Sequence, residues 1–415
     1  MTRIAISAFG TRGDVVPLTG LAHRLRSDGA DVVIAAQEAY RDEIDAAGIA
    51  FAPLPRDTRA ETIASPEAQA LIDGASMRPS KKTLEQMRDG LRGVGQAMAH
   101  ASDGADLLLL EGPVGALLGR HVAAALGLPS VGVIFQPASP TSAFIPPALG
   151  TRSYGPLGNR LVWWMGGFTE RVYAPVVAEL RRDLGLPGKP SAAERRAQRD
   201  RPVLYPFSEA VLPRPSDWPD HLYVTGYLTP EAPGGVPPHV EAFLEDGPPP
   251  VAITLGSTAT AQGERLSAII AQATAAAGVR AVVQRGWAGL APEGEHLLVI
   301  DDLPHAQLFP RCAAVVHHCG AGTTAAAIRA GVPSIPVPGI MDQPFWARRL
   351  HLLGAGTAPL PRHSLSVDGL TEALRSAPDH LDRATKLGAV LRSEDGAGRA
   401  VRVIADMLDP RITPG

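Results

Sequence analysis

Short apolar runs alternate with helical patterns along the first half of the chain. Residues 3–9 have the pattern of a buried strand and end in a glycine turn, and Leu18, Leu21 and Leu25 then recur at helical spacing. The alternation continues through further predicted strands at residues 31–36, 106–110 and 130–135. Strands that alternate with helices pair in parallel, so this half is predicted to be an α/β unit with helices on both faces of its sheet.

Proline interrupts this pattern between residues 212 and 250. The stretches PRPSDWPD, TPEAPGGVPP and EDGPPP are too rich in proline for a helix or a central strand, and they predict a linker between domains. Strand patterns then return at residues 251–255, 281–284, 297–300, 314–317 and 334–337. We therefore expect two α/β domains, 1–211 and 251–415, with a ligand cleft between them, because such sheets bind ligands beyond the carboxyl ends of their strands.

The composition excludes some functions. A chain of 415 residues suits two domains, and a balance of 45% hydrophobic and 20% charged residues is that of an ordinary folded protein. A formal net charge of -3 with scattered basic residues attracts no polyanion, so no nucleic-acid partner is expected. The first residues do not resemble a signal peptide, and no stretch approaches the ~20 apolar residues of a membrane span. With Cys312 and Cys319 interpreted as buried thiols, a cytoplasmic protein is expected.

The segment HHCGAGTT, residues 317–324, is the strongest chemical signal in the sequence. It follows an apolar strand and precedes the helix-forming stretch AAAIRAG, so Gly320 and Gly322 fall at a helix N-terminus. Unpaired backbone N–H groups and the helix dipole bind phosphate at such a position, and His318 and Thr323 add hydrogen-bond donors. A lone glycine turn is more often an ordinary connection, but the two preceding histidines favour a diphosphate site.

Two pairs of polar residues follow strands in the second half. Asp342 and Gln343, in PVPGIMDQPFWA, are suited to hold sugar hydroxyls, although an aspartate before a helix is commonly a cap. Asp301 and Asp302, in DDLPHAQLF, could suggest a metal site. The helix dipole and His318 already supply positive potential to a diphosphate, so we interpret that pair as a solvated loop and expect no metal and no other cofactor.

These motifs resemble the donor-binding region of GT-B glycosyltransferases, in particular sterol 3-β-glucosyltransferases and actinobacterial enzymes that glycosylate antibiotic aglycones. The segment AAVVHHCGAGTTAAAIRAGVPSIPVPGIMDQPFWA carries the resemblance, and GTRGDVVPL, TLGST, QRGWAGL and DDLPHAQLFPRC agree with it. The resemblance implies the GT-B fold of two Rossmann-like domains that face each other across a cleft. It also implies that the N-terminal domain binds an acceptor, that the C-terminal domain binds a nucleotide sugar, and that the last helix packs back on the N-terminal domain.

The resemblance also implies roles for individual residues. The donor diphosphate would be surrounded by Gly13, Gly256, Ser257, Thr258, His318, Gly320, Gly322 and Thr323. Asp342 and Gln343 would hold the donor sugar, while Trp287, Leu303 and His305 would lie by the nucleobase and ribose. Plant members stack the base on a tryptophan at the start of the segment that reads DDLPHAQLF here, so this chain departs from them at that point. UDP-glucose is the favoured donor, and a dTDP-deoxysugar is the alternative.

Asp14 is the expected catalytic base. It lies in GTRGD, on the loop at the carboxyl end of the first strand, where a carboxylate would face the cleft. An inverting, metal-independent hexosyl transfer needs one base to take the proton of the acceptor hydroxyl while the bond from sugar to diphosphate breaks. A helix cap is the other role that this position permits. Glu111, after LLLL, ends at the same sheet edge and would orient Asp14 or the acceptor, unless it is merely solvated.

Aromatic residues gather in FQPASPTSAF, with Phe135 and Phe144, and in LVWWMGGF, with Trp163 and Trp164. They suggest an apolar pocket for a sterol, terpenoid or polyketide aglycone, although such a helical stretch is equally often core. The mildly basic residues 77–93 allow at most peripheral contact with a membrane, and a solvated helix is the commoner interpretation. The stretch ERRAQRDR, residues 194–201, is expected to be exposed surface.

Three other activities fit parts of the pattern. A sugar-nucleotide epimerase could use the same two-domain cradle but would need no apolar acceptor wall. A nicotinamide-dependent oxidoreductase fits less well, because GTRGD is not GxGxxG and the second strand ends in AAQ without an acidic partner for the ribose. A non-catalytic sugar-nucleotide binder is the third alternative, if Asp14 is inert. Sugar transfer to an apolar alcohol distinguishes the predicted glycosyltransferase from all three.

Overall fold

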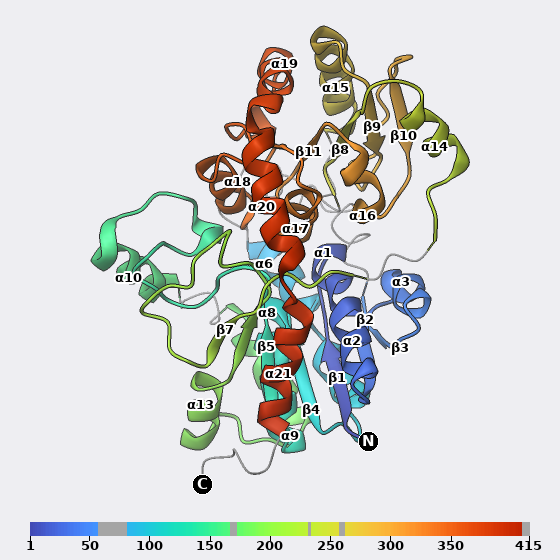
Figure 1. Cartoon of the computed structure of the whole chain (residues 1–415). Helices are drawn as coiled ribbons and strands as arrows, with labels where there is room; N and C mark the ends of the chain where they lie inside the picture. Colours follow the sequence, from blue (N-terminus) through green and yellow to red (C-terminus); the bar gives the residue numbers. More distant parts are fainter. Residues whose placement is uncertain (57–80, 167–171, 231–233, 257–261, 409–415) are drawn as a thin grey trace.

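The computed structural model describes residues 1–56, 81–166, 172–230, 234–256 and 262–408, which form two α/β units, one above the other in Figure 1. The lower unit contains a seven-stranded sheet in the order β3-β2-β1-β4-β5-β6-β7. The upper unit contains a five-stranded sheet in the order β10-β9-β8-β11-β12. Every pairing in both sheets is parallel, so the prediction of two parallel α/β domains is confirmed.

The strands are short and mostly buried. Their bounds are β1 (Arg3–Ser7), β2 (Asp31–Gln37), β3 (Ala50–Leu54), β4 (Leu107–Glu111), β5 (Ser130–Val133), β6 (Val203–Tyr205), β7 (Leu222–Val224), β8 (Val251–Thr254), β9 (Ala281–Gln284), β10 (Leu297–Ile300), β11 (Ala314–His317) and β12 (Ser334–Pro336). The predicted bounds of β9, β10 and β11 agree with the structure to the residue. β3, β6 and β7 were not predicted.

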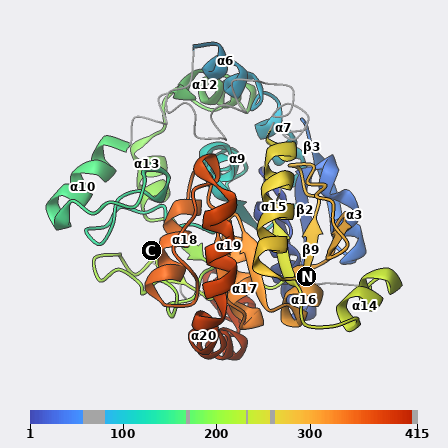
Figure 2. The same cartoon turned by 90° about the horizontal axis from the view of Figure 1, so that it is seen from above.

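The helices of the lower unit include α1 (Arg12–Val15), α2 (Pro17–Ser27), α3 (Arg41–Ala46), α6 (Lys81–Asp89), α7 (Val94–Ala101), α8 (Gly112–Val114), α9 (Arg120–Leu126), α10 (Gly155–Gly166), α12 (Ala174–Asp183) and α13 (Ala192–Arg199). The later helices are α14 (Pro238–Glu245), α15 (Gly263–Ala277), α16 (His305–Leu308), α17 (Ala321–Ala330), α18 (Gln343–Leu352), α19 (Val367–Ser376), α20 (Leu381–Ser393) and α21 (Gly396–Leu408). Seen from above, α10 and α3 of the lower unit lie at opposite sides of the upper unit (Figure 2).

Helices cover both faces of each sheet. In the lower unit, α2 and α21 lie on one face, and α7, α9 and α12 lie on the other. In the upper unit, α15 and α19 cover one face, and α14, α16 and α17 cover the other. The C-terminal helix α21 descends along the lower unit (Figure 1), where Ala400, Val401 and Ile404 pack into the same core as Leu18 and Leu21 of α2. This contact joins the end of the chain to its beginning.

The lower sheet extends into the segment that the sequence predicts to be a linker. β7 lies within residues 212–250 and pairs with β6, and α14 lies in the same segment. β7 has only three residues between proline-rich turns, which is too few to show a strand pattern. Aromatic side chains pack beside it. Trp218 stacks on Tyr205 of the lower unit with 4.6 Å between ring centroids, and Phe207 joins the two units where it meets Trp346 of α18 edge to face at 5.8 Å.

Candidate active site

The strand order of each sheet places a crevice where the two units meet. In the lower sheet β1 lies next to β4, and the loops that leave these strands carry Asp14 and Glu111. In the upper sheet β8 lies next to β11, and these strands lead to Gly256 and His318. Connections diverge at such positions in doubly wound sheets, which leaves room for a ligand. Helix α1 contacts α17 across the junction, so the two crevices face one another.

Asp14 occupies the third position of the short helix α1. Its Oδ2 accepts hydrogen bonds from the backbone N–H of Thr11 at 2.6 Å and from Thr11 Oγ1 at 2.9 Å, which completes a capping box. Burial raises the pKa of Asp14 above 3.8, while the two bonds from Thr11 oppose that rise. Oδ1 has no hydrogen-bond donor among the described residues. The capping role therefore uses one oxygen and leaves the other able to accept a proton.

Two more carboxyl groups lie within electrostatic reach of Asp14. Glu111 is 2% exposed, and burial followed by the charge of Asp14 raises its pKa well above the usual value. Burial raises the pKa of Asp342 to about 6, and the charge of Asp14 adds to that rise. An ionised Asp14 therefore disfavours the ionisation of both neighbours.

The ring of His318 lies between two glycines. A β-carbon at Gly256 would collide with Cε1 of His318, and a β-carbon at Gly320 would lie 2.5 Å from its Nε2, so only glycine fits beside the ring. Gly256 also has a φ of +65°, which favours glycine. Gly320 is the N-cap of α17 and provides no side-chain cap, so the first backbone N–H groups of the helix are open to the crevice.

The remaining residues assigned to the diphosphate are placed unequally. Gly322 and Thr323 lie in the first turn of α17, and a β-carbon at Gly322 would be 3.9 Å from Cγ of Pro17 in the lower unit. Gly13 lies in α1, beside Asp14. Ser257 and Thr258 lie outside the described residues.

Burial keeps both histidines of the HHCGAGTT segment neutral at pH 7. The pKa of His318 is lowered to about 4 by burial and by the charge of Arg362, and that of His317 is lowered to about 3 by burial and by His318. The sequence allowed His318 to act either as a cation or as a hydrogen-bond donor. Before a ligand binds, the structure favours the neutral donor.

Arg362 is a further candidate site residue, which the sequence did not reveal. Its side chain is buried, with 2% of the residue exposed, and its backbone N–H donates to the carbonyl of Pro338 at 3.0 Å. A β-carbon at Gly339 would lie 2.5 Å from Arg362 Nη2 and 3.0 Å from Gln343 Oε1. The guanidinium therefore lies close to the Asp342–Gln343 turn and places a buried positive charge behind His318. A single arginine in the loop LPRHS gives no sequence signal for this role.

The Asp342–Gln343 turn is held by its own helix. Asp342 Oδ2 accepts a hydrogen bond from Trp346 Nε1 at 2.8 Å, and Gln343 Oε1 accepts one from the backbone N–H of Gly339 at 2.8 Å. Although Asp342 occupies the N-cap position of α18, its side chain makes no capping hydrogen bond. The side chains of Asp342 and Gln343 are thus held at the carboxyl edge of the upper sheet, and neither of them caps α18.

The residues predicted to lie by the nucleobase flank the cradle. The backbone N–H of Trp287 donates to the carbonyl of Gly256 at 3.2 Å, which places the backbone of this residue beside Gly256. His305 stacks on Phe309 with 4.4 Å between ring centroids. Leu303 is 3% exposed and packs into the core of the upper unit, so its side chain is the most enclosed of the three.

Arg12 links the two units beside the cradle. Its guanidinium pairs with Asp302 of the upper unit at 3.0 Å and with Glu43 of the lower unit at 3.3 Å. Burial followed by the charge of Arg12 lowers the pKa of His305 to about 3. Asp302 is therefore part of an ion pair between the units, whereas Asp301 pairs with the exposed Arg285 of its own unit at 3.0 Å.

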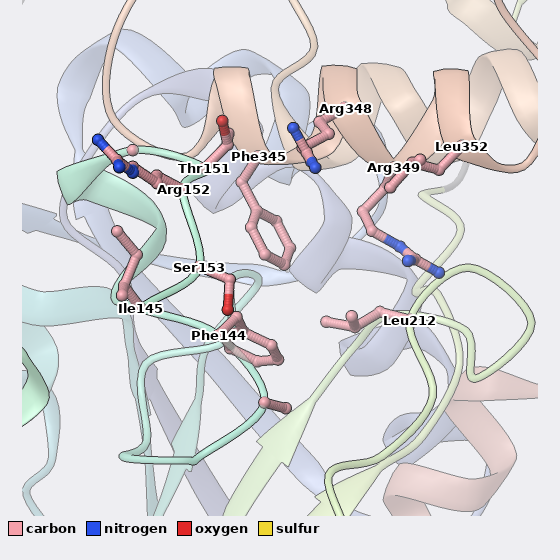
Figure 3. A pocket seen from close by; sticks show the side chains of 12 residues that line it. Phe144, Ile145, Thr151, Arg152, Ser153, Leu212, Phe345, Arg348, Arg349 and Leu352 are labelled. Atoms are coloured by element: carbon pink, nitrogen blue, oxygen red, sulfur yellow. The ribbon is translucent and has the colours of Figure 1, made fainter. Parts of the chain in front are cut away.

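A cavity of about 180 Å³ opens between the loop after β5 and helix α18 (Figure 3). Phe144 and Phe345 meet there edge to face at 5.3 Å, and Trp163 Nε1 donates to the carbonyl of Phe144 at 2.7 Å. Trp163 therefore supports the loop rather than the cavity wall. Phe135 is buried in the core of the lower unit, and Trp164 is 75% exposed; neither lines this cavity. Of the four predicted acceptor residues, the structure brings only Phe144 to the cavity.

The described residues contain neither a metal-ligand cluster nor a membrane-spanning helix. Within these ranges no three histidine, cysteine, aspartate or glutamate residues are grouped so that they could hold a metal ion. No helix in the described part of the chain is long and apolar enough to cross a membrane.

Comparison with known proteins agrees with the fold and the motifs. The model of the glycosyltransferase family 28 N-terminal domain matches residues 4–103, and that of the erythromycin biosynthesis protein CIII-like C-terminal domain matches residues 279–397. The O-mycaminosyltylonolide 6-deoxyallosyltransferase of Streptomyces fradiae is 36% identical over 99% of both chains. A sterol 3-beta-glucosyltransferase of Arabidopsis thaliana is 31% identical over 99% of this chain and 69% of its own length.

A solved structure supports the same architecture. The glycosyltransferase SsfS6 of Streptomyces sp. SF2575, complexed with thymidine diphosphate, matches with a TM-score of 0.59 and 22% identity over 98% of this chain and 100% of that chain. At this identity the match shows the fold, while the full-length match to the 6-deoxyallosyltransferase shows the family. The chain therefore belongs to the GT-B glycosyltransferases, in the family that includes these deoxysugar and sterol enzymes.

Proposed function

We propose that this glycosyltransferase moves a hexose from a nucleoside diphosphate sugar to a hydroxyl group of an apolar aglycone, with inversion at the anomeric carbon and with Asp14 as the base. In this proposal the lower unit binds the acceptor and the upper unit binds the donor. One observation carries the proposal: a carboxylate with one free oxygen lies at the crevice of one sheet, and an uncapped helix N-terminus lies at the facing crevice of the other.

The reaction is a single displacement. Asp14 Oδ1 accepts the proton of the acceptor hydroxyl while the acceptor oxygen attacks the anomeric carbon on the face opposite the diphosphate. The bond between the anomeric carbon and the diphosphate oxygen breaks, and its electron pair leaves with the nucleoside diphosphate. Attack on the opposite face inverts the anomeric configuration. The raised pKa of Asp14 brings the base closer to the pH at which it works.

The leaving group is stabilised by fixed donors. The first backbone N–H groups of α17, an N–H of His318 and the buried charge of Arg362 all lie on the side of the upper unit. Donors held in place before the reaction stabilise developing negative charge without reorganisation. We propose that these groups replace a divalent cation, so that transfer is independent of metal. Asp342 and Gln343 hold the sugar hydroxyls.

The donor is a pyrimidine nucleoside diphosphate sugar. UDP-glucose is favoured by the likeness to sterol 3-beta-glucosyltransferases, and a dTDP-deoxysugar is favoured by the 6-deoxyallosyltransferase and the thymidine diphosphate complex. The 6-deoxyallosyltransferase matches over 99% of both chains, which supports the dTDP-deoxysugar alternative. The acceptor binds through an apolar group beside Phe144 and Phe345.

A transfer assay tests this proposal. The protein is incubated with UDP-glucose, dTDP-glucose or a dTDP-6-deoxyhexose and with a panel of sterol, terpenoid and polyketide alcohols, and glycosides are detected by mass spectrometry. We expect a glycoside whose anomeric proton coupling shows inversion, at the same rate with and without EDTA. Conversion of the donor sugar without an acceptor would favour the epimerase alternative. Binding of nucleotide sugars with no turnover across the panel would favour the non-catalytic binder.

A further inference from the structure

The cavity between the loop after β5 and helix α18 is lined by positive charge as well as by apolar side chains. Three arginines line it, Arg152 of the loop and Arg348 and Arg349 of α18. In the view of Figure 3, Arg152 lies on one side of the rings of Phe144 and Phe345, and the arginines of α18 lie on the other. None of the described residues that line the cavity is acidic. The cavity therefore combines an apolar wall with cationic groups at its edge.

The three guanidinium groups have no carboxylate partner in the described part of the chain, where no ion pair includes any of them. Arg152 lies over the ring of Tyr154 at 5.4 Å, and Arg349 donates to the carbonyl of Val211 through Nε at 2.9 Å and Nη2 at 2.7 Å. The helix dipole favours an arginine in the last turn of α18, but Arg152 belongs to another element. No acidic side chain of these ranges balances the charge at the cavity.

Asp217 fixes the loop that carries Arg152. Its Oδ1 accepts a hydrogen bond from Thr141 Oγ1 at 2.6 Å, and its Oδ2 accepts bonds from the backbone N–H of Ser142 at 2.8 Å and from Arg160 Nη2 at 3.1 Å. This carboxylate does not line the cavity. Because the loop is already held by these bonds, less conformational freedom is lost when a ligand binds beside it.

Helix α18 connects the cavity to the proposed sugar site. Asp342 precedes the helix, and Phe345 lies one turn further on. Arg348 lies six residues after Asp342, which is about 9 Å along the helix axis at ~1.5 Å per residue. The cavity volume of about 180 Å³ is below the roughly 300–1,000 Å³ of pockets that enclose a whole small molecule. We therefore expect this cavity to hold the end of the acceptor that is opposite the reacting hydroxyl.

We propose that the acceptor is an amphipathic acid, that is, an apolar aglycone with a carboxylate at the end opposite the reacting hydroxyl. This inference rests on the proposed function, which gives the cavity its role in acceptor binding. The apolar body lies against Phe144 and Phe345, and the carboxylate pairs with Arg348 and Arg152. A guanidinium group presents parallel N–H donors that match the two oxygens of a carboxylate. Both arginines determine specificity and take no part in the transfer step.

The affinities for a steroid acid and for its neutral ester test this site. Calorimetry with the full-length protein compares deoxycholate, below its micelle concentration, with methyl deoxycholate. The two compounds share the steroid body and its hydroxyls, so the ratio of their affinities reports the carboxylate. Saturating UDP is present throughout, so that the carboxylate does not act through the diphosphate cradle.

We expect the acid to bind about tenfold more tightly than the ester at low salt. The ratio should fall towards one in about 1 M NaCl, where the Debye length is about 3 Å. An ester that binds as tightly as the acid at low salt contradicts the proposal. Failure of both compounds to bind also contradicts it, because the apolar wall should hold the steroid body.

Matched variants locate the carboxylate. Arg348 is exposed, so Arg348→Met should fold, and its ratio of acid to ester affinity should be at least about threefold lower than that of the wild type. Arg348→Glu should make the ester the tighter ligand, because like charges repel. Arg402→Met is the control: it removes an exposed arginine of α21 that does not line the cavity, so the wild-type ratio should remain. Equal ratios in the wild type and in all three variants overturn the assignment.

Transfer kinetics separate this inference from the proposed function. With either compound as the acceptor, we expect a lower KM for the acid and a similar kcat, since the carboxylate contributes to binding and not to the transfer step. Glycosides formed from acid and ester with equal KM leave the proposed function standing and overturn this inference. A preference for the acid that depends on Arg348, with no glycoside formed, supports the anion site and contradicts the proposed transfer.

Discussion

Gly320→Ala tests the geometry of the diphosphate cradle in isolation. The new β-carbon would lie 2.5 Å from Nε2 of His318, about 0.9 Å short of the 3.4 Å at which ordinary van der Waals contact begins. The backbone at Gly320 has a φ of -61°, which alanine adopts without strain, so the effect comes only from the collision. Gly256 also lies against the His318 ring, which limits the room into which the ring can move. Overpacking of this kind costs about 1–3 kcal/mol of folding free energy.

Urea unfolding and calorimetry with UDP measure the two consequences. Gly320→Ala should lose about 1–3 kcal/mol of stability and bind UDP at least tenfold more weakly, because the ring that donates to the diphosphate is displaced. Gly322→Ala is the control for stability: its β-carbon meets only Cγ of Pro17 at 3.9 Å, so its stability should be unchanged or higher. In the background of His318→Ala, the added cost of Gly320→Ala should nearly vanish. Wild-type stability and UDP affinity in Gly320→Ala would refute the packing of His318 between the two glycines.

Three further predictions concern charges at the site. Thr11→Val removes the hydroxyl hydrogen bond to Asp14, so the pKa of Asp14 should rise and the acidic limb of the kcat/KM profile should move to higher pH; an acidic limb that does not move would show that Asp14 is not the base. His317 has a folded-state pKa of about 3, below its unfolded value, so the stability that its neutral ring contributes is present above pH 6.5 and is lost on acidification. Between pH 6.5 and pH 5, His317→Asn should therefore lose about 2 kcal/mol less free energy of unfolding in urea than the wild type. An equal loss in both proteins would contradict this. Arg362→Met should raise the pKa of His318, measured by NMR titration, and should weaken UDP binding about tenfold in calorimetry. Unchanged values would show that Arg362 does not act on the diphosphate site.

The fold was predictable where apolar strands are bounded by polar residues. β9, β10 and β11 stand out in this way, and their predicted bounds agree with the structure. β3 contains a proline and lies at the edge of its sheet, and β6 and β7 have three residues each, so none of them shows a periodic pattern. The lower sheet therefore extends further along the chain than the proline-rich composition predicts.

The candidate site was predictable where one short motif carries the chemistry. GTRGD and HHCGAGTT indicated Asp14 and the helix N-terminus, because each motif is local in sequence. Arg362 and the ion pair of Arg12 with Asp302 depend on contacts between distant segments, which no local pattern reveals. The aromatic segments could not be assigned to wall or core, because helical spacing alone does not say which face of α10 meets the cavity.

The rate of sugar transfer by Asp14→Asn is the most direct test of the proposed mechanism. Asparagine can keep the hydrogen bond from Thr11 but is not a base, so the variant should fold and bind the donor within about threefold of the wild type while transfer slows by about 10²–10⁴-fold. Single-turnover transfer from UDP-glucose or dTDP-glucose to the best acceptor of the panel gives the rate, and calorimetry with the same nucleotide gives the affinity. A folded variant that transfers the sugar within tenfold of the wild-type rate would contradict the assignment of Asp14 as the base.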